Sequence, residues 1–174
     1  MDQVIERTRT FLQLPSREIK PRHQGMSILI DNGVSTQRFL DVIGSYSEFI
    51  DLVKFGWCTA LVTKDLERKI EFLVENDVEF YFGGTLFEKA LQQKKLDALY
   101  LYFKQWRCRY VEISNGTINL SNREKAKYIS DFSQEFNVFS EVGYKDCEKS
   151  QQLTPEHWIE YIRRFGSGFD KGHY

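Results

Sequence analysis

The sequence predicts an α/β protein built on a parallel sheet, and two observations carry this prediction. Five short β-rich runs alternate with longer stretches of helical periodicity, and the runs start about every 23–31 residues, roughly the length of one βα unit. Most of these runs are also too apolar for an edge exposed to water, as expected for strands buried in a parallel sheet. Repeated βα units define the α/β class.

Each element can be placed from its residues. Two predicted helices have the capping-box pattern at their starts, formed by Thr85 with Glu88 and by Ser121 with Glu124. A further helix is predicted to start after Thr154, an N-cap followed by proline at the first helical position. The predicted strands span residues 26–31, 49–56, 78–82, 109–114 and 137–143.

Charged side chains stand near the carboxyl ends of four of the five predicted strands, namely Asp31, Lys54, Glu112 and Glu141. Alternate residues of a strand point to one face, and we expect these four to share the inward face. A buried ionised group is costly unless it is paired or bound, and the mouth of a parallel barrel is where such groups find a use. Five βα units alone fit either a doubly wound open sheet or part of a barrel, and the charged strand ends favour a barrel wall, with strands in sequential order and helices outside.

Composition and charge exclude several other classes. The chain has 174 residues with 24 Lys+Arg against 25 Asp+Glu, so its bulk charge favours neither nucleic acid nor an anionic membrane. Its first residues are unlike a signal peptide, its apolar runs are too short to span a membrane, and its three cysteines form no CxxC pair. We expect a cytoplasmic protein with a polar arm at residues 1–25 and one domain at 26–165.

Glu112 and Glu141 occupy matching positions on consecutive predicted strands, and neighbouring strands lie about 4.8 Å apart. Two carboxylates this close either share a proton or hold a cation between them. With Asp31 from the first strand they would offer an all-oxygen site, which suits Mg²⁺ better than zinc. The alternative is that each carboxylate pairs with a basic neighbour or with water.

Two lysines are candidates for chemistry. Lys54 lies near the end of the second predicted strand and could be a general acid, an anion ligand or a Schiff base. It could equally form a structural salt bridge to Glu112 or Asp31. Lys145 follows the fifth strand on a loop, where an ordinary solvated lysine is the alternative. Trp57 is most simply a packing residue.

Two turns follow predicted strands. The glycines of Gly83-Gly84-Thr85 would allow close backbone approach, and the first N–H groups of the helix that follows would attract an anion. The same residues also suit a tight turn with a threonine cap. Ser114-Asn115-Gly116-Thr117 has the composition of an ordinary turn.

Taken together, these stretches resemble one family, the phosphosulfolactate synthases, over about residues 20–162. Six motifs occur in order and at similar spacings, which is more specific than any single motif. One departure is Cys58, which stands where the family usually has glycine. The six stretches are 20–22 (KPR), 30–33 (IDNG), 51–57 (DLVKFGW), 82–88 (FGGTLFE), 111–117 (VEISNGT) and 140–145 (SEVGYK).

The resemblance implies a (β/α)₈ barrel and a Mg²⁺-dependent carbon–sulfur lyase. Its reaction would be Michael-type addition of sulfite to phosphoenolpyruvate, giving phosphosulfolactate on the route to sulfolactate or coenzyme M. For this chemistry we predict that Asp31, Glu112 and Glu141 hold Mg²⁺. We predict that Lys54 protonates the substrate and that Lys145 helps to hold it. The predicted substrate-binding residues are Gly83, Gly84, Thr85, Ser114 and Asn115.

The resemblance also implies about three further βα units after Tyr174. We therefore expect a barrel truncated to about five units, with residues 166–174 as a tail unlike the family. Apolar strand faces left open by the missing units would favour a homo-oligomer. The rival interpretation is a catalytically inactive truncated homologue, or a stress-related binding protein of the same fold.

Overall fold

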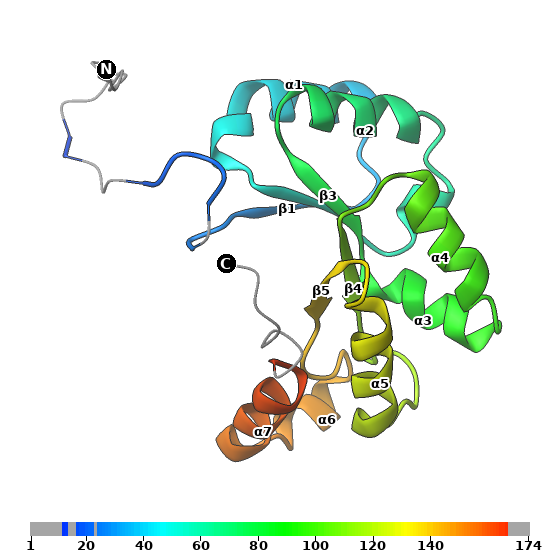
Figure 1. Cartoon of the computed structure of the whole chain (residues 1–174). Helices are drawn as coiled ribbons and strands as arrows, with labels where there is room; N and C mark the ends of the chain where they lie inside the picture. The colour runs from blue at the N-terminus through cyan, green and yellow to red at the C-terminus, as the bar shows by residue number, and fades with distance from the viewer. Residues whose placement is uncertain (1–11, 14–16, 23, 167–174) are drawn as a thin grey trace.

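The computed structural model describes residues 12–13, 17–22 and 24–166, and it has the alternation of strands and helices that the sequence predicts. Each strand is followed by at least one helix before the next strand begins (Figure 1). The strands are shorter than predicted, but each lies inside its predicted range. They are β1 (Ile28–Asp31), β2 (Leu52–Phe55), β3 (Glu79–Phe82), β4 (Tyr110–Ile113) and β5 (Asn137–Ser140).

The helices begin largely where their sequences indicate. The capping box of Ser121 with Glu124 is confirmed, and a helix starts at Pro155 as predicted. The capping box of Thr85 with Glu88 is wrong, because the helix already begins at Gly84 and has no side-chain cap. The helices are α1 (Thr36–Tyr46), α2 (Leu66–Glu75), α3 (Gly84–Gln92), α4 (Leu96–Gln105), α5 (Asn122–Phe132), α6 (Cys147–Gln151) and α7 (Pro155–Gly166), with 3₁₀ turns η1 (Ser47–Phe49) and η2 (Thr59–Leu61).

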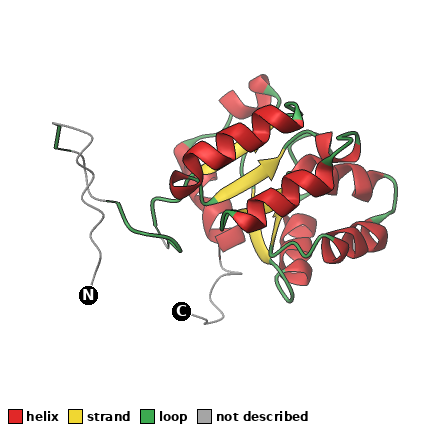
Figure 2. Cartoon of the chain, turned by 90° about the horizontal axis from the view of Figure 1, so that it is seen from above, coloured by secondary structure: helices red, strands yellow, loops and turns green. Residues whose placement is uncertain are grey.

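All hydrogen-bonded strand pairs are parallel, which confirms the predicted α/β class. The five strands do not form one continuous ladder, however, because they divide into a sheet β1-β2-β3 and a sheet β4-β5. β3 and β4 lie next to each other and are linked by an ion pair between Glu79 Oε1 and Arg109 Nη1, 2.6 Å apart. The described residues therefore form a curved row of strands in sequential order and no closed barrel (Figures 1 and 2).

The hydrophobic core lies between the strands and the helices. Phe55 of β2 and Phe82 of β3 pair in register, with ring centroids 5.7 Å apart. Phe39 of α1 stacks on Phe55 at 6.1 Å, and Phe103 of α4 stacks on Phe82 at 6.0 Å. All four rings are almost fully buried, so this row of aromatic contacts attaches the helices to one face of the first sheet.

The strand register decides which charged residues share a face. Lys54 pairs with Ile30 on one side and with Tyr81 on the other, whereas Asp31 pairs with Phe55. Paired residues of neighbouring parallel strands point to the same face. Asp31 therefore lies on the helix side with Phe55, and the prediction that it shares the inward face with Lys54 is wrong.

The described part of the N-terminal arm is attached to the domain. Arg22 Nη1 lies 2.8 Å from Asp51 Oδ1, and the Arg22 side chain is only 6% exposed. Lys20 Nζ donates to the carbonyl of Asp77 at 3.0 Å. These contacts lie just before β2 and β3, at the sheet end away from the predicted site. Residues 1–11, 14–16, 23 and 167–174, which include most of the predicted tail, lie outside the described residues.

None of the helices in the described ranges is long and apolar enough to cross a membrane. The three cysteines, Cys58, Cys108 and Cys147, are all described and all free.

Candidate active site

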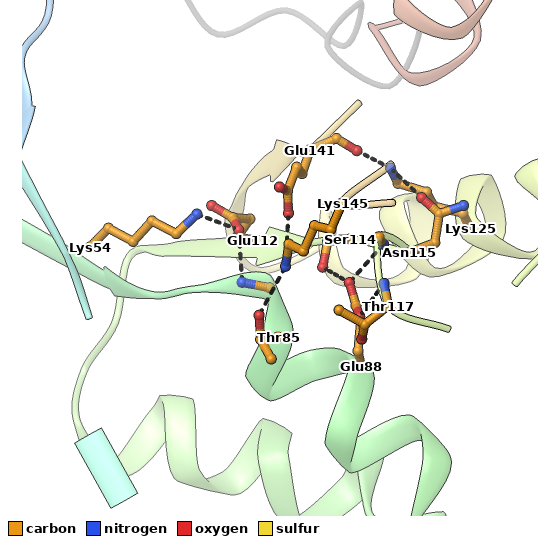
Figure 3. A network of polar contacts seen from close by, with 12 residues as sticks. Lys54, Thr85, Glu88, Glu112, Ser114, Asn115, Thr117, Lys125, Glu141 and Lys145 are labelled. Atoms are coloured by element: carbon orange, nitrogen blue, oxygen red, sulfur yellow. Dashed lines mark hydrogen bonds and ion pairs between the residues drawn. The ribbon is translucent and has the colours of Figure 1, made fainter. Parts of the chain in front are cut away.

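Glu112 is the centre of a polar cluster at the carboxyl ends of β2 to β5 (Figure 3). Its Oε1 atom accepts hydrogen bonds from Lys54 Nζ and from the Gly84 N–H, each 2.8 Å long. Tyr81 also hydrogen-bonds to this carboxylate. Burial, followed by the charge and hydrogen bond of Glu112, raises the pKa of Tyr81 well above its usual value, so the phenol stays protonated as a donor. The Glu112 side chain is 6% exposed and is held by donors from three elements.

Glu141 and Lys145 form the second part of the cluster. Lys145 Nζ donates to Thr85 Oγ1 at 3.0 Å and lies 3.8 Å from Glu141 Oε2. That distance is too long for a hydrogen bond, and Glu141 Oε2 accepts none although it is buried. A buried carboxylate oxygen without a hydrogen-bond donor still has lone pairs that can bind a cationic partner.

Trp57 covers Lys145 and is not a core residue. The ammonium lies 5.1 Å from the centroid of the indole ring, which is within cation–π range. Trp57 is 62% exposed, so its interpretation as a packing residue is wrong. Trp57 and Cys58 both have positive φ, 53° and 60°, in the left-handed region that favours glycine. Cys58 thus stands at a position where the glycine usual in the family would be less strained.

The two glycines of the turn before α3 are required by close packing. A Cβ at Gly84 would lie 2.4 Å from Ser114 Oγ and 3.0 Å from Glu112 Oε1. A Cβ at Gly83 would lie 2.9 Å from Lys54 Cε. The predicted close approach is therefore real, but it brings the turn against β2 and β4. Since the Gly84 N–H already donates to Glu112, the anion at this helix start is a carboxylate of the chain itself.

The loop after β4 is likewise occupied by an internal carboxylate. Glu88 of α3 is fully buried and accepts hydrogen bonds from Ser114 Oγ, the Gly116 N–H and the N–H and hydroxyl of Thr117. Burial alone would raise the pKa of Glu88, but the hydrogen bonds from Ser114 and Thr117 outweigh it and lower the pKa. The hydroxyl of Ser114 is thus committed to Glu88, and its predicted role as a substrate ligand stays a prediction.

Asn115 connects this loop to a buried lysine. Its side-chain amide donates to the Leu120 carbonyl at 3.0 Å, and its Oδ1 accepts from Lys125 Nζ at 3.3 Å. Lys125 also donates to the backbone carbonyl of Glu141. Lys125 is fully buried, and burial lowers its pKa to about 8 against the opposing effect of the carboxylates Glu141, Glu88 and Glu112.

Asp31 lies outside this cluster. Its Oδ2 pairs with Lys69 Nζ at 2.6 Å, and its Oδ1 accepts from the N–H groups of Gly33 and Val34 at 2.8 and 2.9 Å. Both oxygens are used to fix the loop between β1 and α1. In the part of the chain that the structure describes, no three His, Cys, Asp or Glu side chains come together as a metal site. The expected convergence of Asp31 with the two glutamates is therefore not formed.

A cavity of about 620 Å³ adjoins the cluster between the loops that follow β4 and β5. Residues 115–120 line one side, and Tyr144, Lys149 and His157 contribute to the other. Asn115 borders this cavity, whereas Lys54, Glu112, Glu141 and Lys145 do not line it.

Two of the buried charges, Lys69 and Lys125, were not predicted from the sequence, and Glu88 was predicted only as a capping residue. Each has a signal in the sequence, because each lies in the helix stripe that faces the core. Lys69 lies four residues before Leu73 and Lys125 lies four residues before Ile129, and both apolar residues are buried. An ionisable residue on an apolar helix face predicts a buried polar contact.

These features define an α/β protein with a carboxylate and lysine site at the carboxyl ends of its parallel strands. The family model for (2R)-phospho-3-sulfolactate synthase (ComA) matches residues 15–168. The chain belongs to this family, as its six motifs predict.

Three relatives named phosphosulfolactate synthase are similar to the chain. The protein from Bacillus subtilis is 56% identical over 151 residues, which cover 87% of this chain and 60% of that protein. The relative from Methanothermobacter thermautotrophicus is 35% identical over 86% of the chain and 59% of its own length. The relative from Methanocaldococcus jannaschii is 32% identical over 80% and 57%. The chain thus spans about 60% of the length of these relatives.

Proposed function

We propose that the chain functions in the addition of sulfite to phosphoenolpyruvate, the reaction that gives phosphosulfolactate. Membership of the family supports the proposal, and so do the names of the three relatives. The observation that carries it is the cluster of Lys54, Glu112, Glu141 and Lys145 at one end of the strands. Two cationic and two anionic groups there suit a reaction between anions in which charge develops on a carboxylate.

The donor set fits Mg²⁺ with two carboxylates and not three. Glu112 and Glu141 offer only oxygen ligands, and Glu141 Oε2 is buried without a hydrogen-bond donor. Mg²⁺ commonly takes one or two protein carboxylates and completes its coordination with water and substrate oxygens. Glu112 and Glu141 would therefore hold the ion, and Asp31 would not. When bound, the ion would stabilise negative charge on the substrate carboxylate.

Lys54 is the group we assign to proton transfer. The sulfur lone pair of sulfite forms a bond to C3 of phosphoenolpyruvate while the C2–C3 π electrons move toward the carboxylate. The addition is completed when C2 takes a proton. Lys54 keeps 22% of its side chain exposed although it is paired with Glu112, so its ammonium can be reached from the site. It would give its proton to C2 and later regain one from solvent.

Lys145 is the group we assign to substrate binding. Its ammonium has Thr85 Oγ1 and the Trp57 ring as neighbours and 27% of its side chain is exposed. These two neighbours are uncharged, and the nearby carboxylate oxygen, Glu141 Oε2, lies beyond hydrogen-bond distance at 3.8 Å. The ammonium therefore remains available for an anionic group of the substrate.

The test is an assay with sulfite, phosphoenolpyruvate and Mg²⁺, with the product followed by phosphorus NMR and with phosphoenolpyruvate binding measured by calorimetry. We expect Mg²⁺-dependent binding, and turnover wherever the rest of the site is supplied. Binding without turnover would favour the rival function, a non-catalytic binding protein of the same fold. The absence of both would refute the proposal for this chain.

A further inference from the structure

We propose that Glu88 and Lys125 are positioning residues, which clamp the loop 114–117 and the end of β5 from two sides and thereby fix the candidate site. This proposal rests on the proposed function for its meaning in catalysis. Figure 3 shows Glu88 below Ser114, Asn115 and Thr117 and Lys125 to their right, with Lys54 at the far left of the same view.

Both residues are charged groups removed from water. The relative exposure of each is 0%, yet neither forms an ion pair with another side chain in the described part of the chain. Transfer of an isolated charge into the protein interior is strongly unfavourable unless hydrogen bonds replace its hydration. The partners of the two groups therefore show what the buried charges stabilise.

Glu88 has no capacity left for a ligand. Oε1 accepts from Ser114 Oγ and from the Gly116 N–H at 2.9 Å, and Oε2 accepts from the hydroxyl and the N–H of Thr117, the latter at 2.9 Å. Four donors saturate the roughly four acceptor sites of a carboxylate. All four donors belong to one loop. The Glu88 carboxylate therefore occupies the position at which these donors could otherwise bind an anionic ligand.

Lys125 is satisfied in the same way. Its ammonium donates to the Glu141 carbonyl and to Asn115 Oδ1, and it lies 4.4 Å from the centroid of the Phe165 ring. Two acceptors and one aromatic face account for the three N–H bonds of the ammonium. Lys125 thus joins the end of β5 to the loop after β4.

The clamped atoms are next to the groups assigned to chemistry. Ser114 is two residues beyond Glu112, and Lys125 binds the backbone of Glu141 itself. Gly116 supports the stem of Lys145, because a Cβ there would lie 3.1 Å from Lys145 Cγ. A loss of either buried charge would therefore displace both carboxylates and Lys145 together.

Two variants and a matched control test the clamp. Glu88→Gln keeps the shape of the side chain but puts an amide donor against the loop donors, and Lys125→Met removes the ammonium. Glu135→Gln is the control, since Glu135 is an exposed carboxylate that accepts from Tyr100 and Lys104 on a different surface. The readouts are residue-resolved hydrogen exchange without ligand, and Mg²⁺-dependent phosphoenolpyruvate affinity well below the melting temperature.

With Glu88→Gln we expect the amide of Gly116, of Thr117 or of both to exchange about tenfold faster or more, because the side-chain amide keeps one oxygen acceptor, replaces the other with an NH₂ donor and removes the negative charge. With Lys125→Met we expect faster exchange around Glu141. Exchange in α1 and α2 should not change. The affinity for phosphoenolpyruvate should fall by about 10–100-fold in both variants, which is the usual effect of removing a residue that orients the ligands of a metal site. The affinity of the control should not change.

Three results would overturn the clamp: unchanged exchange at Gly116 and Thr117, faster exchange across the whole chain, or local loosening with unchanged affinity. If Glu88→Gln fails to fold, Thr117→Val removes one hydroxyl donor and should give a smaller local increase, whose absence would also count against the clamp. Wild-type protein that binds no phosphoenolpyruvate would refute the proposed function, whereas ligand-free exchange would still decide whether the clamp exists.

Discussion

Lys54 Nζ lies 2.8 Å from Glu112 Oε1, and the two partners differ in their access to water. The carboxylate side chain is 6% exposed and has further donors in Gly84 and Tyr81, whereas the lysine side chain is 22% exposed. The pair satisfies the structural alternative for Lys54 and also places an accessible ammonium in the site. An experiment must therefore distinguish the role of Lys54 as an ion-pair partner of Glu112 from its proposed role as a proton donor.

We predict that Lys54→Met lowers turnover by about 10²–10⁴-fold, the usual effect of removing a general acid. Lys54→Arg should be almost as inactive, because arginine can keep the ion pair with Glu112 but does not release its proton in proteins. Steady-state assays of both variants, in this chain if it is active or in a full-length relative, measure the effect. Near-normal activity of Lys54→Arg would leave Lys54 with a structural role only.

Glu141→Gln should weaken Mg²⁺ binding with little effect on folding. Glu141 Oε2 accepts no hydrogen bond, and its ion pair with Lys145 is long at 3.8 Å, so its loss removes only a weak internal contact. We expect the free energy of unfolding to change by about 0.5 kcal/mol or less, as for a surface substitution. Calorimetric titration with Mg²⁺ should show affinity reduced about tenfold or more, since a charged ligand is replaced by a neutral one. Unchanged Mg²⁺ affinity would exclude Glu141 as a ligand.

Lys69→Met should destabilise the fold through Asp31. The ion pair joins side chains that are 0% and 1% exposed, and removal of the lysine leaves a buried carboxylate without its partner. Such changes cost about 3–5 kcal/mol, which urea denaturation would measure. The double variant Asp31→Asn with Lys69→Met should recover part of the loss. If the single variant is as stable as wild type, our inference that the ion pair stabilises the fold is wrong.

The strands could be predicted because each is an apolar run bounded by turn residues, and the charged strand ends could be predicted to mark the site. The face of Asp31 could not be predicted, because alternation fixes parity within a strand but not the register between strands. That register places Asp31 opposite Phe55, so Lys69 binds it from the helix side. A period-2 pattern within each strand contains no information about the register between β1 and β2.

Glu88 illustrates a second limit. Its spacing from Thr85 fits a capping box, and local sequence gives no reason to reject that interpretation. The carboxylate instead binds a loop 26–29 residues away. Four hydrogen bonds from that loop stabilise the carboxylate more than the single backbone N–H that a capping box would supply. Contacts between distant segments determined its role, and these follow from the packing of α3 against β4.

The last prediction concerns the outer edge of β1. Among the described residues β1 has a strand neighbour on one side only, and Met26, Ile28 and Ile30 are 43%, 43% and 51% exposed. An unpaired strand edge next to exposed apolar side chains favours pairing with another chain. We therefore expect the 174-residue chain to self-associate, with a second copy covering this edge.

Size-exclusion chromatography with light scattering over a range of concentrations measures the association. Ile28→Lys with Ile30→Lys should shift the protein toward monomer, because charges on an edge strand oppose pairing. Leu101→Lys is the matched control, since Leu101 is an apolar residue of α4 that is 66% exposed and distant in sequence from β1. It should leave the association unchanged. A wild-type monomer at all concentrations, or an equal effect of the control, would show that the β1 edge does not drive assembly.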